Sequence, residues 1–465
     1  MSGAKNVERV AGARTFKTYT AYKDSSVEWI GEIPAHWKVT KTKFAARLRS
    51  GHTPSRLHPK YWQDCIIPWF GLADVWQIRH GRTDYVTETA EKISELGLAN
   101  SAARLLPKGT VILSRTASVG FSAILGLDMA TTQDFVNWVC GPTLRPEYLL
   151  NVFRSMQHEF RRLTMGSTHQ TIYMPAVGAF CTPLPSIPDQ DRIVAFVREN
   201  TARIDALVAK KERLIELLLE KRSALITRAV TKGLGPNVPM KDSGVEWLGE
   251  IPAHWEVKKL KCVSALQTGV TLGKRYESTR LEVRQYLRVA NVQDGSLDLA
   301  DIAEIAVPID EVRRYELEPG DVLLTEGGDF DKLGRGYVWD GQIPNCLHQN
   351  HIFAVRPAQA SLSSHFVSTV MSSGYGRAYF TATSKQSTNL ASTNSTKLKN
   401  FPMPLPIRIE QDEIVDFLAK ETGKLERMAQ RTKEAIDHLK ELRTALISAA
   451  VTGKIDVRER GEDHG

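Results

Sequence analysis

Two long stretches of the chain carry apolar residues at the spacing of heptad a and d positions. They run from Asp189 to Thr231 and from Glu410 to Thr452. This spacing predicts two amphipathic helices, each with an apolar seam of the coiled-coil type. A glycine follows each stretch, at Gly233 and Gly453, and predicts the end of the helix, because glycine readily caps a helix C-terminus.

The predicted seams can be named. They are Ile193, Val197, Ile204, Leu207, Leu214, Leu218 and Leu225 in the first helix, and Ile414, Leu418, Leu425, Met428, Leu439, Leu442 and Leu446 in the second. Lys211 and Lys221 interrupt the first seam, and we expect the second helix to be irregular near Gly423 and the polar stretch Gln430–Thr432. A helix of about 43 residues is roughly 65 Å long, and its apolar stripe must be buried. The other helix is the simplest partner. We favour an antiparallel pairing, because in a parallel one the intervening segment would have to span the helices.

An internal repeat divides the chain into two copies of about 220 residues. Asp24–Val39 and Asp242–Val257 are identical at 13 of 16 positions, at an offset of 218. Two further pairs match at an offset of 221: Leu184–Val197 with Leu405–Leu418, and Arg222–Thr231 with Arg443–Thr452. We call these shared segments the frame. Between them the copies diverge, which favours one frame that carries two modules with different targets. The alternative is a second module that lost its role after duplication.

The divergent segments predict modules of short strands and short helices. Runs rich in β-branched and aromatic residues, separated by turn signals, predict strands at 65–70, 109–114, 134–140, 285–291, 321–325 and 351–356. Segments 146–162 and 363–379 predict short helices. The predicted fold class is therefore α+β: two globular mixed α/β modules joined by a pair of long antiparallel coiled-coil helices, with an internal pseudo-twofold repeat.

Charge narrows the class of partner. The 465 residues are 42% hydrophobic, which excludes a wholly disordered chain, and carry a net charge of +8. Segment 38–188 has 17 basic and 10 acidic residues, and segment 256–409 has 18 and 16, so the basic excess lies on the modules rather than on the helices. This distribution indicates that the modules bind a polyanion such as duplex DNA. A solvated basic surface without such a partner is the alternative.

The remaining composition indicates a cytoplasmic protein. The five cysteines are far apart and form no CxxC pair, so neither a disulfide framework nor a zinc ribbon is indicated. Free thiols fit a reducing cytosol. The sequence contains no run of 18 apolar residues, so no membrane span is expected. Segment 1–22 lacks the apolar centre of a signal peptide.

Several polar loops could carry side chains into a DNA groove. Base reading requires Arg, Lys, Asn, Gln, Ser or Thr on loops that can enter the groove. The DNA-binding candidates are Thr53, Ser55, Arg56, Arg79, Arg82, Arg115, Thr116, Ser118, Thr168, His169, Gln170, Lys332, Arg335, Gln349, Asn350, Lys385, Gln386 and Lys397. The alternative for each is an ordinary turn or a capped polar loop.

Motifs of common catalytic centres are missing from the sequence. It has no GxxxxGK[ST], no HExxH and no Asn-Pro-Pro-aromatic motif of an adenine methyltransferase. His348 and His351 lack a third ligand, and we interpret them as polar residues at a strand edge rather than a metal site. The glycine-rich segment 326–332 is better interpreted as a loop than as a nuclease centre, because the first copy has no equivalent. We therefore predict a reader without catalytic residues. A self-contained nuclease or methyltransferase, and a coiled-coil scaffold that binds proteins alone, are the alternatives.

These features resemble the specificity subunit of type I restriction-modification systems. The resemblance lies in the paired starts at Leu184 and Leu405 with their Gln-Asp pairs, in the long helices that follow, and in the repeated EWxGEIPAHW. Shorter motifs in the modules are also similar: Ser50–Ser55, Ile67–Trp69, Ser114–Thr116, Thr132–Phe135, Gly320–Leu323, Gly334–Arg335, His348–Asn350 and Ser395–Leu398. The resemblance covers nearly the whole chain.

The resemblance implies a non-catalytic subunit that reads a split site in duplex DNA. In this family two target recognition domains are held on an antiparallel pair of helices, and each reads one half of the site. Two methyltransferase subunits and two motor-nuclease subunits join it, so S-adenosylmethionine, ATP and Mg would be bound by these partners and no cofactor by this chain. Trp29, Trp37, Trp247 and Trp255 are candidates for contact with the methyltransferase. A tryptophan clasp that packs the frame on itself is the alternative.

The resemblance also gives domain boundaries. They are an N-terminal arm with the first frame repeat at 1–37, target recognition domain 1 at 38–188, a central long helix at 189–233, a linker with the second frame repeat at 234–257, target recognition domain 2 at 258–409, a C-terminal long helix at 410–454 and a tail at 455–465.

Overall fold

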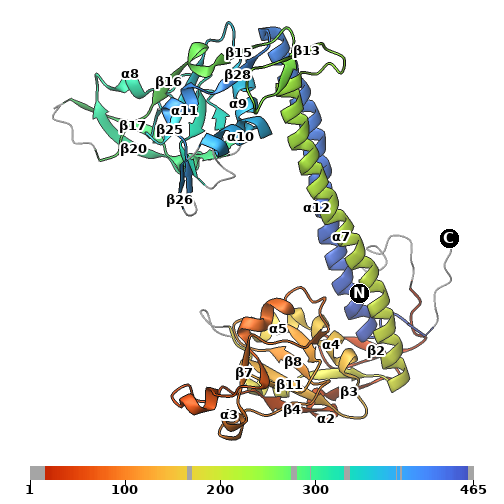
Figure 1. Ribbon diagram of the computed structural model, residues 1–465. Coiled ribbons are helices and arrows are strands. Elements are labelled where there is room, and N and C mark those ends of the chain that lie inside the picture. Colours follow the sequence, from red (N-terminus) through yellow and green to blue (C-terminus); the bar gives the residue numbers. More distant parts are fainter. Residues whose placement is uncertain are drawn as a thin grey trace. The chain divides into compact units, whose positions relative to one another are not determined.

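The computed structural model describes residues 16–164, 170–273, 280–293, 295–328, 336–383, 385–387 and 390–458, without the side chains of 385–387 and 390–392. The chain divides into two compact units, 1–211 with 434–465, and 212–433. Each unit contains one globular module and one part of each of two long helices, α7 (Ile187–Lys232) and α12 (Arg408–Val451) (Figure 1). The mixture of helices and sheets is the predicted α+β class.

A five-stranded sheet forms the centre of the first module. Its strands, in spatial order, are β4 (Ala46–Ser50), β11 (Phe135–Cys140), β8 (Val111–Ser114), β9 (Ser122–Leu125) and β6 (Tyr85–Val86). Neighbours are antiparallel except β6 and β9. Alternate side chains of β8 enter two cores: Val111 and Leu113 join the core that includes helix α4 (Pro146–Ser155), and Ile112 joins the core on the other face. This burial on both faces explains why three successive residues of β8, Val111, Ile112 and Leu113, are apolar.

The other elements of the first unit surround this sheet. A second sheet has the order β10 (Ala130–Thr131), β5 (Ile67–Phe70) and β7 (Glu91–Ile93). The remaining elements are β1 (Tyr22–Asp24), β2 (Glu32–Pro34), β3 (Lys38–Lys41), α2 (Thr42–Ala45), the 3-10 helices Pro59–Trp62 and Leu72–Gln77, α3 (Glu95–Ala99), α5 (Gln157–Leu163), α6 (Met174–Gly178) and β12 (Cys181–Leu184).

The second module is built around a four-stranded sheet. Its strands, in spatial order, are β16 (Ser264–Thr268), β25 (Ile352–Pro357), β21 (Val322–Thr325) and β23 (Gly336–Val338). Two further sheets have the orders β20 (Ala303–Pro308), β17 (Leu281–Leu287), β24 (Leu347–His348), and β22 (Gly327–Gly328), β27 (Leu390–Ser392), β26 (Lys385–Ser387). The other elements are β13 (Met240–Asp242), β14 (Glu250–Pro252), β15 (Glu256–Lys259), the 3-10 helices Leu260–Cys262 and Val289–Asn291, β18 (Val292–Gln293), β19 (Ser296–Leu297), α8 (Val312–Tyr315), α9 (Ser364–Ser372), α10 (Gly374–Thr383), α11 (Ser395–Lys399) and β28 (Pro402–Leu405).

The predicted strands are confirmed in five of the six segments, and the sixth is corrected. Segment 285–291 is not one strand, because β17 ends at Leu287 and a 3-10 turn follows at Val289–Asn291. The Asn291 side chain accepts a hydrogen bond from the backbone N–H of Arg288 at 2.8 Å, which closes this turn. The two predicted short helices are each divided in two, into α4 and α5 and into α9 and α10.

The frame repeats fold in the same way in each unit. Tyr22 pairs with Pro34 in the hairpin β1–β2, and Met240 pairs with Pro252 in β13–β14. Strand β3 pairs with β12, and β15 pairs with β28, again antiparallel. The shared sequence therefore encodes a shared local structure in both copies.

Both long helices are confirmed, and each is continuous. Helix α7 begins where Ser186 Oγ accepts a hydrogen bond from the backbone N–H of Asp189 at 3.3 Å, as an N-cap residue does. It ends at Gly233, whose φ of +72° lies in the left-handed region that favours glycine. The predicted irregularity at Gly423 and Gln430–Thr432 is wrong, because α12 runs through these residues without a break.

The seam of the helices differs from the predicted one at Leu207, Leu214, Met428 and Leu442, and Leu442 is half-buried beside the heptad position of Arg443. Leu207, Leu214 and Met428 are 48%, 40% and 50% exposed. In each helix, ten buried or half-buried positions follow a strict heptad that includes polar residues: 197, 201, 204, 208, 211, 215, 218, 222, 225 and 229 in α7, and 418, 422, 425, 429, 432, 436, 439, 443, 446 and 450 in α12. Because some members of this heptad are polar, a pattern of apolar residues alone predicts the neighbouring Leu207, Leu214 and Met428 instead.

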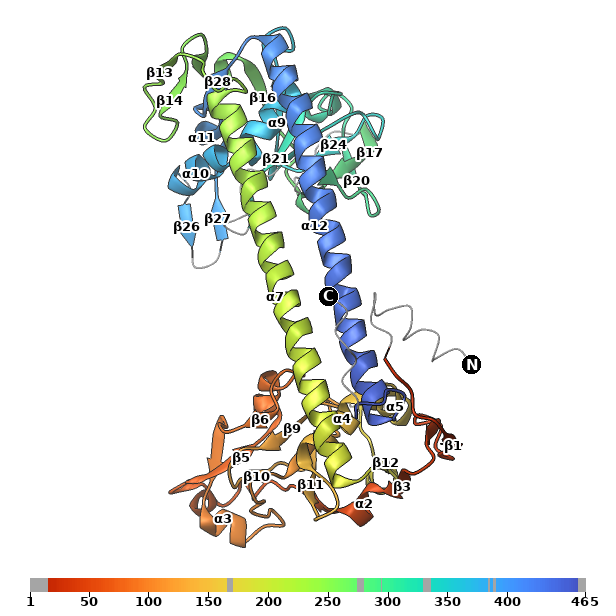
Figure 2. The same cartoon turned by 90° about the vertical axis from the view of Figure 1, so that its right-hand side faces the viewer.

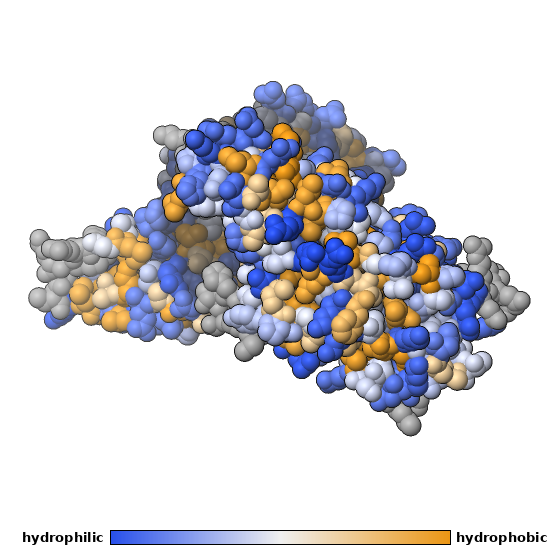
Figure 3. All heavy atoms as spheres, turned by 90° about the horizontal axis from the view of Figure 1, so that it is seen from below, coloured by the Kyte–Doolittle hydropathy of each residue, from blue (hydrophilic) through white to orange (hydrophobic). Residues whose placement is uncertain are grey.

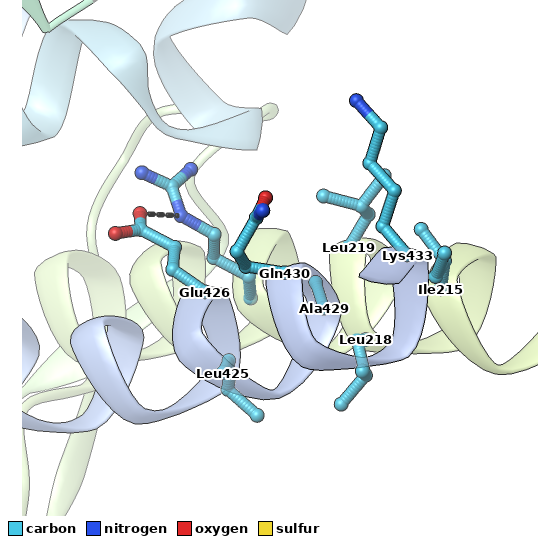
Figure 4. Close-up of a pocket in the computed structure, with 9 residues that line it drawn as sticks. Ile215, Leu218, Leu219, Leu425, Glu426, Ala429, Gln430 and Lys433 are labelled. Atoms are coloured by element: carbon cyan, nitrogen blue, oxygen red, sulfur yellow. Dashed lines mark hydrogen bonds and ion pairs between the residues drawn. The ribbon is translucent and has the colours of Figure 1, made fainter. Parts of the chain in front are cut away.

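The helices run in opposite directions within each unit. In the first unit Arg443 Nε lies 3.2 Å from Asp205 Oδ1, and in the second Arg222 Nε lies 2.9 Å from Glu426 Oε1. Figure 2 shows the two helices side by side, and Figure 4 shows Glu426, Leu425 and Ala429 of α12 with Leu218 of α7. Arg222, the partner of Glu426, lies with them. All five residues line one shallow apolar groove of the second unit.

Candidate nucleic-acid interface

Three candidate loops of the first module meet around Gln133. Thr53 Oγ1 donates a hydrogen bond to Gln133 Oε1 at 2.6 Å, and Arg115 Nε donates to the Gln133 carbonyl at 3.1 Å. The Arg115 carbonyl accepts from the backbone N–H of Ile172 at 2.8 Å, which ties in the chain that follows Gln170. Loops 50–56 and 114–120 and the segment 170–172 are thus brought to one place, although they are far apart in sequence.

Glycine is required where the first of these loops leaves strand β4. A Cβ atom on Gly51 would lie 2.1 Å from the carbonyl oxygen of Thr132, so a larger residue would force the two segments apart. The next residue, His52, donates its backbone N–H to the carbonyl of Thr131 at 3.0 Å. The loop therefore lies against the end of β10 from its first residue.

Arg56 is held in a fixed orientation at the tip of this loop. Its guanidinium carbon lies 3.5 Å from the ring centre of Trp62 and 5.7 Å from that of Trp69, as in a cation–π contact. Its Nη2 atom lies 2.5 Å from Glu91 Oε2. Trp62 Nε1 in turn donates to the carbonyl of Ser55 at 3.2 Å. About half of the Arg56 side chain is exposed, so an ordered guanidinium faces the solvent.

The second module builds the corresponding place in the same way. A Cβ atom on Gly269, after strand β16, would lie 2.0 Å from the carbonyl oxygen of His348. Val270 N donates to that carbonyl at 2.7 Å, and Asn350 N donates to the Val270 carbonyl at 2.9 Å. The candidates Gln349 and Asn350 therefore follow β24 at the place where Gln133 follows β10 in the first module.

Glu326 joins two further segments of the second module. Its carbonyl accepts from Thr393 N at 2.9 Å, and its backbone N–H donates to the carbonyl of His351 at 2.9 Å. His351 Nδ1 lies 2.6 Å from Glu326 Oε2. Because Thr393 follows β27, the hairpin β26–β27 is anchored beside the segment that contains Gln349 and Asn350.

The remaining candidates are distributed unevenly. Gln170 and Ser55 are exposed, Thr116 and Ser118 are half-buried, and Lys397 is half-buried and donates from Nζ to the carbonyl of Thr383. Lys385 and Gln386 lie on β26, and their side chains are outside the described part. Thr168, His169, Lys332 and Arg335 lie outside the described residues.

Arg79 and Arg82 do not belong to the Gln133 cluster. Both are exposed and lie on the loop before β6. Arg82 Nε is 3.5 Å from Asp205 Oδ1 on α7, so the structure gives Arg82 an intramolecular partner on the helix. Sequence reasoning could not find this contact, because Asp205 is more than 100 residues away.

The histidine pair is divided between two environments. His348 is buried, with Nδ1 3.1 Å from the carbonyl oxygen of Tyr315, and burial lowers its pKa to about 4. It is therefore neutral at pH 7, whereas His351 is exposed beside Glu326. Within the described ranges, no group of three His, Cys, Asp or Glu side chains is placed to hold a metal ion.

The four frame tryptophans fall into two classes. Trp37 and Trp255 are fully buried, and Trp255 Nε1 donates to Glu410 Oε1 at 3.0 Å. These two pack the frame and offer no surface to a partner. Trp29 is half-buried and Trp247 is 49% exposed, so the candidate partner contact narrows to Trp29 and Trp247.

Two buried glutamines fasten the modules to the helices. Gln190 Oε1 accepts from the backbone N–H of Arg145 at 2.8 Å, and Nε2 donates to the carbonyls of Thr143 at 2.9 Å and Pro185 at 3.0 Å. Gln411 makes the same three bonds, to Ser363 N, Ser361 O and Pro406 O. The repeated Gln-Asp pair thus joins the start of each long helix to the start of α4 or α9.

Sequence reasoning missed the residues that organise the first cluster. Gln133, Trp62 and Glu91 were not among the candidates, although Gln133 lies in the motif Thr132–Phe135. A polar residue directly after a short strand was the available signal.

Figure 3 shows apolar residues in separate groups among polar ones on the face that it displays, and exposed apolar side chains of the first module include Phe44, Leu57 and Trp76.

Comparison with known proteins agrees with this organisation. Residues 34–217 match the family described as type I restriction modification DNA specificity domain. The type I restriction enzyme MjaIX specificity subunit of Methanocaldococcus jannaschii is 25% identical over 69% of this chain and 72% of the relative. The StySPI specificity subunit of Salmonella potsdam is 22% identical over 93% of this chain and 92% of its own.

A solved structure has the same fold. The HsdS subunit from Thermoanaerobacter tengcongensis is 17% identical and superposes with a TM-score of 0.52 over 91% of this chain and 98% of its own. Among the described residues, no helix is long and apolar enough to cross a membrane. The matched family model and the relatives that align over most of the chain make this chain similar to the specificity subunits of type I restriction-modification systems, and the solved structure shares its fold.

Proposed function

We propose that this chain reads a split site in duplex DNA and directs partner subunits to it. Segments 38–188 and 258–409 act as the two target recognition domains, each reading one half of the site. One observation carries the proposal: two modules of divergent sequence place candidate polar loops at the same position, against Gly51 in one and Gly269 in the other. A shared position with different side chains is what two readers of different half-sites require.

The long helices, at 189–233 and 410–454, act as an antiparallel coiled coil that sets the distance between the half-sites. The ion pairs of the helices support a pseudo-twofold relation. At the repeat offset of 221, Asp205 corresponds to Glu426 and Arg222 corresponds to Arg443. The ion pair of Asp205 with Arg443 in the first unit is therefore the counterpart of the ion pair of Glu426 with Arg222 in the second. The ten seam positions of α7 and α12 are related by the same offset.

The partners supply the chemistry. Two methyltransferase subunits carry S-adenosylmethionine and two motor-nuclease subunits carry ATP and Mg, whereas this chain contributes no catalytic group. The N-terminal arm 1–37 and the linker 234–257 hold the two frame repeats, and the surfaces of Trp29 and Trp247 offer one methyltransferase contact on each. The tail 455–465 follows the second helix, and the complex works on DNA in the cytoplasm.

Salt-dependent binding tests this function. The full chain with its methyltransferase subunit is titrated with a fluorescent duplex at increasing salt. Because phosphate contacts release counterions, the affinity should fall by more than about tenfold between 50 and 200 mM salt. A specific duplex should also outcompete a scrambled one. Affinity that does not change with salt would favour the protein scaffold instead.

A further inference from the structure

The loop before β6 connects the first module to the long helices. Arg443 on α12 donates from Nη2 to the carbonyl of Gly81 at 2.8 Å and from Nε to Asp205 Oδ2 at 3.3 Å. Arg82 on the loop lies 3.5 Å from the same aspartate. One arginine therefore binds both the recognition module and helix α7. We call Arg443, Asp205 and Gly81 the helix clamp.

The loop is also held from the side of the module. Arg154 on α4 donates from Nη1 to Asp84 Oδ1 at 2.6 Å and from Nη2 to the carbonyl of Thr83 at 2.8 Å. The side chains of Arg154 and Arg443 are 12% and 16% exposed, so solvent screens these contacts little. The loop thus contacts both α4, which packs on the sheet, and the long helices, and it links the position of the module to that of the helices.

Among the residues that the structure describes, the second unit has no corresponding contact at the equivalent place. Arg222, the counterpart of Arg443, pairs with Glu426 and lines the groove drawn in Figure 4. The second module is joined to α7 elsewhere, where Gly374 N donates to Thr227 Oγ1 at 2.8 Å. The two copies of the repeat therefore contain equivalent arginines in different surroundings. Arg443 binds the first module through Gly81, and Arg222 lines the groove.

We propose that Arg443 is a positioning residue that fixes the angle of the first recognition module on its helices, and thereby the spacer length accepted between the half-sites. The inference rests on the proposed function. One added base pair rotates a half-site by about a tenth of a turn and moves it by about 3.4 Å. A module held from two sides cannot follow such a change, whereas a loosened module can.

The test compares Arg443→Ala with the matched control Arg222→Ala. Each full chain is assembled with its methyltransferase subunit and given duplexes whose spacers differ by one base pair in either direction. The wild type and Arg222→Ala should methylate one spacer length. The complex that contains Arg443→Ala should methylate duplexes with altered spacers at a rate within about tenfold of its rate on the native spacer, with unchanged half-sites. Asp205→Asn, which removes the shared partner of Arg82 and Arg443, should act in the same way and serves if Arg443→Ala does not fold.

Two results would overturn the inference. Arg443→Ala and Asp205→Asn that keep the wild-type spacer preference would show that the helix clamp does not set it. A changed half-site sequence in these variants would assign the clamp to base reading instead. A wild-type complex that methylates no split site would instead overturn the proposed function, and this inference with it.

Discussion

Replacing Gln190 with methionine should destabilise the first unit and leave the second unchanged. The side chain is fully buried, and methionine has nearly the same length without hydrogen-bonding groups. The substitution leaves one backbone N–H and two carbonyls without the partners that they have at 2.8, 2.9 and 3.0 Å. At about 1–2 kcal/mol for each buried group, the free energy of unfolding should fall by about 3–6 kcal/mol.

The repeat provides matched variants for this measurement. Gln411→Met removes the equivalent three bonds and should lower the stability of the second unit by a similar amount. Gln63→Met, at an exposed position after the 3-10 helix Pro59–Trp62, should change stability by less than about 0.5 kcal/mol. Hydrogen exchange followed by mass spectrometry, with denaturant titration, reports each unit separately. A loss below 1 kcal/mol for Gln190→Met would refute the reasoning, as would an equal loss in both units from one variant.

Three further predictions concern single side chains. Burial lowers the pKa of His348 to about 4, so the unfolded chain binds a proton more readily than the folded chain. Urea titrations should therefore show a loss of stability of at most about 3 kcal/mol as the pH falls from about 6.5 to 4. His348→Gln should remove this dependence of stability on pH. Arg56→Gln should reduce methylation of the native site in a radiolabel assay while stability, read from urea titration, changes by less than about 1 kcal/mol, because its ion pair is exposed. Trp37→Ala should lower the free energy of unfolding by about 3–5 kcal/mol, measured by urea titration. Trp247→Ala, at a half-exposed side chain, should mainly weaken methyltransferase binding, measured by calorimetry.

The long helices were predictable because their periodicity extends over many turns. Both lie within two residues of the expected bounds. The seam was less predictable, because Thr201, Lys211 and Arg222 occupy heptad positions that a search for apolar residues passes over. A polar residue keeps its place in a seam when its neighbours in the heptad fix the register.

The candidate interface was predictable as a set of loops but not as an arrangement. The meeting of Thr53 and Arg115 at Gln133 joins segments that local patterns cannot relate. Arg82 was grouped with DNA contacts for the same reason, since its partner Asp205 lies on a distant helix. The cation–π contact of Arg56 with Trp62 has no sequence signature, because it depends on how the chain turns between them.

Mapping methylated adenines tests the central claim most directly. The genome of a host that expresses this chain with its methyltransferase subunit is sequenced for adenine methylation, beside a host without this chain. The account predicts methylation at one split sequence, two short defined half-sites separated by an unspecified spacer of constant length. It also predicts that exchanging segment 38–188 for another module changes one half-site and leaves the other intact. An uninterrupted site, or methylation that is the same without this chain, would contradict the account.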